Sequence, residues 1–121
     1  MPKRVDFSRM QFSTLLVVGE TLKGSIKSRD NICIQGRFHG SISTRGFVRV
    51  DEGAEMVGDI EAREAQILGK VKGNLRIAKM LDLGPAGKIE GNYTTRMMWA
   101  PLGYQVPQGS TVQKKNFPMF Y

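Results

Sequence analysis

The sequence returns five times to a glycine, one spacer residue and then a residue that is usually bulky and apolar. The glycines of these units are spaced 15 to 18 residues apart. The five units are Gly24-Ser25-Ile26, Gly40-Ser41-Ile42, Gly58-Asp59-Ile60, Gly73-Asn74-Leu75 and Gly91-Asn92-Tyr93. A period this short holds one supersecondary unit, which cannot bury its apolar side alone and must stack on its neighbours. The repeat therefore predicts a solenoid.

Apolar residues alternate with other residues between these glycines, as in β-strands with one buried side. The longest alternating runs are residues 32–42 and 65–77, and turn sequences occupy 51–53 and 84–87. Glycine weakens a flat sheet, but it fits a chain that turns a corner in each coil. We therefore expect an all-β protein, a single-stranded parallel β-helix of about five to six short coils. Residues 59–68 are rich in helix formers, and a local helix there is the alternative.

Three segments follow from this pattern. Residues 1–13 lack alternation and predict a flexible arm, and residues 14–100 hold the coils. Residues 101–121 contain proline and glycine without periodicity, and they predict a disordered tail. No stretch approaches the roughly 20 apolar residues of a membrane-spanning helix or resembles the core of a signal peptide. We expect a cytoplasmic protein with one domain.

Residue types that carry catalysis are sparse. His39 is the only histidine, and the alternation predicts that it faces solvent. Cys33 is the only cysteine and turns away from Ile32 and Ile34, which predicts an exposed or semi-buried thiol. The sequence contains no metal-ligand cluster, phosphate-binding loop or nucleophile elbow. We therefore expect no enzyme activity, no catalytic residue, no cofactor, no metal and no small-molecule substrate.

Two alternative functions remain open. The left-handed β-helix acyltransferases also have coils of about 18 residues, and in that case His39 would carry the chemistry. Their aliphatic residue at every sixth position is not maintained here. A nucleic-acid-binding protein would use the net charge of +7, and its affinity would fall steeply with salt. However, the excess charge is concentrated in the two terminal segments, and aromatic residues are few.

The repeats resemble those of the bactofilin family over roughly residues 14–96. The opening coil, residues 14–26, is similar to the first coil of that family. The segments 34–42 and 67–75 are similar to its doubled-glycine coils, and residues 50–60 and 91–95 also fit. One departure is the segment Met97 to Gly103, which stands where the family often has a glycine-alanine-x-phenylalanine-x-glycine turn.

The resemblance implies a right-handed, three-faced β-helix that polymerises end to end without nucleotide. It also implies a bacterial cytoskeletal scaffold, often held at the inner face of the cytoplasmic membrane by a short N-terminal segment. Such scaffolds position machinery for cell-wall growth, cell shape or chromosome organisation. The expected partners are therefore other copies of this chain, the anionic membrane surface and morphogenesis proteins.

Both ends of a β-helix expose unpaired backbone groups above an apolar core, and such edges recruit partners unless they are capped. Apolar side chains occur at the first and the last coil, and neither flank contains an obvious amphipathic capping helix. We expect an assembly interface in which these residues take part: Leu15, Leu16, Val18, Met97, Met98 and Trp99. The alternative is that they only close the core.

The N-terminal arm mixes apolar and basic side chains, a composition that binds anionic lipid weakly. A single copy would bind marginally, whereas many copies on a filament would bind by avidity. The residues expected to target the membrane are Lys3, Arg4, Val5, Phe7, Arg9, Met10 and Phe12. An arm without function is the alternative.

Overall fold

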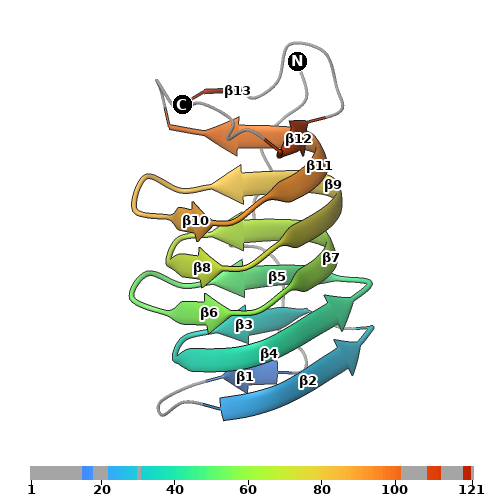
Figure 1. Cartoon of the computed structure of the whole chain (residues 1–121), viewed down its shortest axis with the longest axis vertical. Coiled ribbons are helices and arrows are strands. Elements are labelled where there is room, and N and C mark those ends of the chain that lie inside the picture. Colours follow the sequence, from blue (N-terminus) through green and yellow to red (C-terminus); the bar gives the residue numbers. More distant parts are fainter. Residues whose placement is uncertain (1–14, 18–21, 30, 102–108, 113–118, 121) are drawn as a thin grey trace.

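The computed structural model describes residues 15–17, 22–29, 31–101, 109–112 and 119–120. Within these ranges every regular element is a strand, and all of the strands join one 13-stranded sheet through parallel pairs. The sheet winds into a solenoid of about five turns, so the predicted all-β parallel β-helix is confirmed (Figure 1). The described part of the chain has no helix long and apolar enough to cross a membrane.

The solenoid has three faces, each a column of parallel strands. Face 1 contains β1 (Leu15–Val17), β3 (Ile32–Ile34), β5 (Phe47–Val50), the second parts of β7 (Ile60–Ile67), β9 (Leu75–Leu83) and β11 (Tyr93–Ala100), and β13 (Met119–Phe120). Face 2 contains the first parts of β2 (Leu22–Ser28) and β4 (Arg37–Thr44), followed by β6 (Glu55–Val57), β8 (Lys70–Lys72) and β10 (Lys88–Glu90). Face 3 contains the remaining parts of β2, β4, β7, β9 and β11, and then β12 (Thr111–Val112).

The glycine of each repeat forms the corner between face 2 and face 3. The backbone of Gly58 has a φ of 135°, which L-residues with a side chain rarely adopt. A Cβ on Gly58 would also overlap the carbonyl oxygen of Gly40 in the preceding coil. The other glycines of the five units have φ between 142° and 148°. The glycine period is therefore a requirement of the corner geometry.

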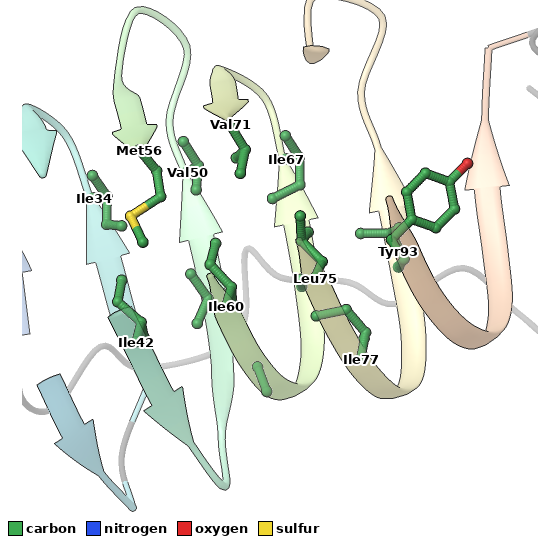
Figure 2. Packing of buried hydrophobic residues seen from close by; sticks show 14 of the residues in the cluster. Ile34, Ile42, Val50, Met56, Ile60, Ile67, Val71, Leu75, Ile77 and Tyr93 are labelled. Atoms are coloured by element: carbon green, nitrogen blue, oxygen red, sulfur yellow. The ribbon is translucent and has the colours of Figure 1, made fainter. Parts of the chain in front are cut away.

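The apolar residue of each unit lies directly on its counterpart in the next coil. Ile42 pairs with Ile60, Ile60 with Leu75, and Leu75 with Tyr93, and all four are at most 3% exposed. Figure 2 shows these side chains pointing into the interior together with those of face 1 and face 2. Burial of each such side chain contributes about 1.5–3 kcal/mol. The repeat thus builds the core one layer at a time.

Residues 59–68, for which a local helix was the alternative, contain strand β7 instead. Ile60 and Ile67 at its two ends are both fully buried, whereas Glu61 and Arg63 are exposed. Pairing with β5 and β4 on one side and β9 on the other satisfies its backbone groups. Tertiary pairing therefore outweighs the weak helix propensity of this stretch.

A sixth glycine with a positive φ, Gly109, follows the five that the sequence analysis identified. Gly109 lies 18 residues after Gly91 and has a φ of 92°. The hydroxyl of Ser110 accepts a hydrogen bond from the backbone N–H of Tyr93, and β12 then pairs with β11. The repeat therefore continues past residue 100, where we expected a disordered tail. The segment Gly109-Ser110-Thr111 escaped notice because it has no apolar residue, and the pairing of Thr111 with Thr94 places Ser110, not Thr111, next to Tyr93.

The corner geometry predicts a large difference between two glycine-to-alanine changes. Gly58→Ala should lower the free energy of unfolding by more than about 2 kcal/mol, because backbone strain at a positive φ adds to the overlap of the new Cβ with the Gly40 carbonyl. Gly53→Ala is the matched control: its φ is 83°, but a Cβ there meets nothing within 4 Å. Denaturant unfolding followed by circular dichroism measures both, and equal losses of stability would contradict the corner argument.

Candidate assembly surfaces at the ends of the solenoid

The N-terminal end exposes the edges of two strands. Among the described strands, β1 pairs only with β3, and β2 pairs only with β4. No described strand takes up the other edge of β1 or of β2, so a further coil could pair there. Figure 1 shows β1 and β2 together at one end of the stack.

The side chain of Ile26 lies at this N-terminal end of the core. It occupies the position that Ile42 occupies one coil later, yet Ile42 is 1% exposed and Ile26 is only partly buried. The difference arises because Ile42 lies between two coils, whereas Ile26 is covered on one side only. A further coil that paired with β2 would bury Ile26 as fully as its counterparts.

The C-terminal end is covered in part by the chain itself. β12 pairs with β11 at Thr94 and Thr95, and β13 pairs with it at Trp99 and Ala100. On face 2, β10 pairs only with β8 among the described strands, and Ile89 within it is partly buried against the core. Among the described strands the two ends therefore differ, since β12 and β13 pair with β11 at the C-terminal end and no described strand lies beyond β1 and β2.

The residues expected at the interface lie as follows. Leu15 and Leu16 are in β1, paired with Ile32 and Cys33, and Val18 lies outside the described residues. Met98 is fully buried in the core of its own chain, so it supports the last coil from within. Met97 and Trp99 alternate with Met98 and are partly buried on the outer side of face 1. The part of all six residues in assembly stays a prediction.

The residues expected to target the membrane all lie outside the described residues. They are Lys3, Arg4, Val5, Phe7, Arg9, Met10 and Phe12. Their role likewise stays a prediction.

Ile26 and Ile89 are the end residues that the sequence reasoning missed. A signal was present for Ile26, because it is the apolar residue of the first unit and so has a counterpart on one side only. Ile89 gave no comparable signal, since a further glycine unit at Gly91 follows it in the sequence.

A polar ladder runs along the outside of the glycine corner. Asp59 Oδ1 accepts a hydrogen bond from the N–H of Asn74 at 3.0 Å, and Asn74 Oδ1 accepts one from the N–H of Asn92 at 3.1 Å. The ladder borders a groove of about 560 Å³ on face 3, which Glu61 and Arg76 also line. These side chains therefore join the coils to one another, in addition to the pairing of the strands.

His39 lies on the outer side of face 2, partly exposed, next to Lys23 and Val57 in the adjoining coils. Among the described residues, no group of three or more His, Cys, Asp or Glu side chains is placed to hold a metal ion. The groove on face 3 has neither histidine nor cysteine among its described lining residues.

Comparison with known proteins agrees with this architecture. The family model of the bactofilins, described as polymer-forming cytoskeletal proteins, matches residues 14–106, which is more than half of the chain. The chain belongs to the bactofilin family. No curated protein and no solved structure is similar enough to count as a match. This bactofilin is thus a member of a structural cytoskeletal family, and the match to the family model ends at residue 106.

The structure corrects the expectation for Cys33. Its side chain does turn away from the core, but it is 2% exposed rather than solvated. Burial raises the pKa of the Cys33 thiol to about 11. The negative charge of Asp51 and a hydrogen bond from the Cys33 thiol to Asp51 Oδ2 at 3.6 Å act in the same direction, whereas Arg49 opposes them. The thiol is therefore uncharged in the folded protein at neutral pH.

The raised pKa predicts a loss of stability at high pH. In the unfolded chain Cys33 ionises near its ordinary pKa of about 8.5, whereas in the folded chain it stays protonated to about 11. Its contribution is complete below the unfolded pKa and is lost as pH rises toward the folded pKa. Between pH 8 and 10.5, the free energy of unfolding should fall more in the unaltered protein than in Cys33→Ala. The difference between the two falls should be at most about 2 kcal/mol. Parallel denaturant titrations of the two proteins measure this, and identical pH profiles would contradict it.

Proposed function

We propose that this bactofilin assembles end to end into filaments that need no nucleotide, and that these filaments act as a cytoskeletal scaffold for cell-shape or cell-wall machinery. The observation that carries the proposal is the N-terminal end, where the open edges of β1 and β2 coincide with the partly buried Ile26. The polymer-forming character of the family supports it.

A partner coil at this end would reproduce what β4 already does for β2. β4 pairs with all seven residues of β2 and places Ile42 on Ile26. Each hydrogen bond in such a pairing contributes about 0.5–1.5 kcal/mol net, and burial of the isoleucine adds to it. If each molecule makes a contact at both of its ends, the assembly does not close and becomes a filament.

Assembly is tested by a charge at the exposed end of the core. Ile26→Lys should abolish sedimentable polymer, because an end-to-end contact would bury the ammonium group without a partner. Val57→Lys is the matched control, since Val57 is a partly buried aliphatic residue on the outer side of β6, in the middle of the stack. Ultracentrifugation and negative-stain electron microscopy without nucleotide or metal measure the polymer. Filaments in a folded Ile26→Lys protein would refute the proposed interface.

We further propose that the scaffold lies at the inner face of the cytoplasmic membrane, held by the basic and apolar side chains of residues 1–12. Face 2 supports this with a column of cations at outward positions, opposed by only two acids among the described residues. The cations are Lys23, Arg37, Lys70, Lys72 and Lys88, and the acids are Glu55 and Glu90. A filament would present the arm and this column repeatedly to an anionic surface.

Membrane association is tested by reversing charges in the arm. The change Arg4→Glu with Arg9→Glu should weaken binding to phosphatidylglycerol vesicles at least tenfold, because each basic residue near the surface contributes about 1 kcal/mol. The double change Arg45→Glu with Arg63→Glu is the control, since both residues are exposed and lie away from face 2. Vesicle flotation measures binding, and equal flotation of both variants would contradict a role of the arm.

A further inference from the structure

The corner of the solenoid where face 3 meets face 1 carries one basic residue in each of five successive coils. Strands β7, β9 and β11 bend there from one face to the other (Figure 1), and the register between them shifts at the bend. In the first two coils the same corner directly follows β2 and β4. The five residues are 16 to 18 positions apart in the sequence and are all exposed, and we call this row the basic edge: Arg29, Arg45, Arg63, Lys79 and Arg96.

Backbone contacts between the coils hold the basic edge in one row. The N–H of Arg63 donates a hydrogen bond at 3.1 Å to the carbonyl oxygen of Gly46, the residue next to Arg45. Lys79 and Arg96 directly precede two methionines that pair with each other in β9 and β11. Neighbouring strands lie about 4.8 Å apart, so the five charges follow one another over about 19 Å of the solenoid axis. The fold thus gathers cations that are far apart in the sequence.

A row of like charges in neighbouring coils destabilises the fold, because like charges at adjacent strand positions repel. The neighbouring outward row on face 3 avoids this in part, since Glu61 forms an ion pair with Arg76 at 3.9 Å. On the basic edge, Lys79 pairs with Glu64 at 3.6 Å. No ion pair links the four arginines of the edge to a carboxylate among the described residues. The described part of the chain therefore leaves most of this positive charge without compensation.

The basic edge lies opposite face 2. In a solenoid with three faces, the corner between two faces is the part of the surface farthest from the third face. A filament that turned the cations of face 2 toward a membrane would therefore turn the basic edge away from it. The edge can thus serve a second anionic partner, and binding of that partner requires neither the proposed filament nor the proposed membrane contact.

We propose that the basic edge binds the phosphate backbone of double-stranded nucleic acid without reading its sequence. Arginine suits this partner, because a guanidinium group can hold a phosphate through two parallel hydrogen bonds. The outward row of face 3 next to the edge adds basic and hydroxyl side chains, which also contact phosphates in known complexes. That row consists of Lys27, Ser43, Glu61, Arg76 and Thr94.

The basic edge and the adjoining row of face 3 lack the side chains that other anionic partners need. Neither row contains an aromatic residue, on which the bases of a single strand would stack. Neither contains a large apolar residue of the kind found at the centre of a protein–protein interface. Charge and hydrogen bonding alone suit a duplex backbone, with a dissociation constant of roughly 10⁻⁴ to 10⁻⁶ M at physiological salt. Many copies on a filament would bind more tightly by avidity.

Fluorescence anisotropy of the full chain with a labelled DNA duplex of about 20 base pairs, over a series of salt concentrations, tests the basic edge. Arg45→Glu with Arg63→Glu should weaken binding roughly tenfold or more. The slope of log affinity against log salt concentration should become shallower by about two, one for each lost phosphate contact. Arg37→Glu with Lys72→Glu is the matched control, because both residues are exposed on face 2 and the net charge changes equally. This control should keep the full slope.

Two further variants separate the effect of charge from an effect on folding. Arg45→Lys with Arg63→Lys retains both charges and should keep the full slope. Arg45→Gln with Arg63→Gln removes them without reversal and should make the slope shallower by about two, as the glutamate variant does. Circular dichroism checks that each variant is folded. A second DNA duplex of different sequence should bind equally, and the same duplex made as RNA identifies which nucleic acid binds more tightly.

Three outcomes would overturn this role of the basic edge. One is an equal loss of slope in the Arg45/Arg63 and Arg37/Lys72 glutamate variants, because net charge alone would then explain binding. Another is polyglutamate that binds the edge more tightly than the duplex, which would indicate an acidic protein partner. The third is loss of vesicle flotation in the Arg45/Arg63 variant, which would assign the edge to the membrane. Failure of filaments to form would leave all of these measurements valid, since a single copy carries the whole edge.

Discussion

Close approach of backbones at the glycine corner is the constraint on which the solenoid depends. The carbonyl oxygen of Gly40 occupies the space that a Cβ on Gly58 would need, and the same relation joins Gly58 to Gly73 and Gly73 to Gly91. Because the corner cannot accept a side chain, each coil lies in direct register on the one before. Strand pairing, the apolar ladder and the Asp59–Asn74–Asn92 ladder all follow from that register.

A stack built in this way has no intrinsic limit, and this property links the fold to its proposed role. Every coil pairs with its neighbours through the same backbone groups, so the first and last coils keep edges that match those buried inside. At the N-terminal end, Ile26 and the edge of β2 are left half covered, whereas β12 and β13 partly cover the other end. In the proposed filament the subunits would need no nucleotide to order them, because the energy of assembly would come from completing pairs that the described strands leave open.

Much of the fold was predictable because the repeat is periodic in both glycine and apolar residues. The short stacked strands, the turns near Gly53 and Gly87 and the buried Ile42, Ile60 and Leu75 follow from that pattern. Strand β12 was missed because Ser110, a polar residue, takes the position next to Tyr93, one residue out of step with the earlier glycine units. At the candidate interface, alternation identified the outer coils, but the full burial of Met98 depends on which side of β11 faces the core.

The sequence by itself determined the solenoid, because glycine at a positive φ and an apolar residue two positions later act locally and repeat in every coil. Only the tertiary structure decided the state of face 1. Alternation shows that Cys33 and Asp82 turn away from the core, but it gives no information on what lies over them. Their burial depends on packing between segments far apart in the chain, and for this reason Cys33 is a protected thiol with a raised pKa rather than a solvated one.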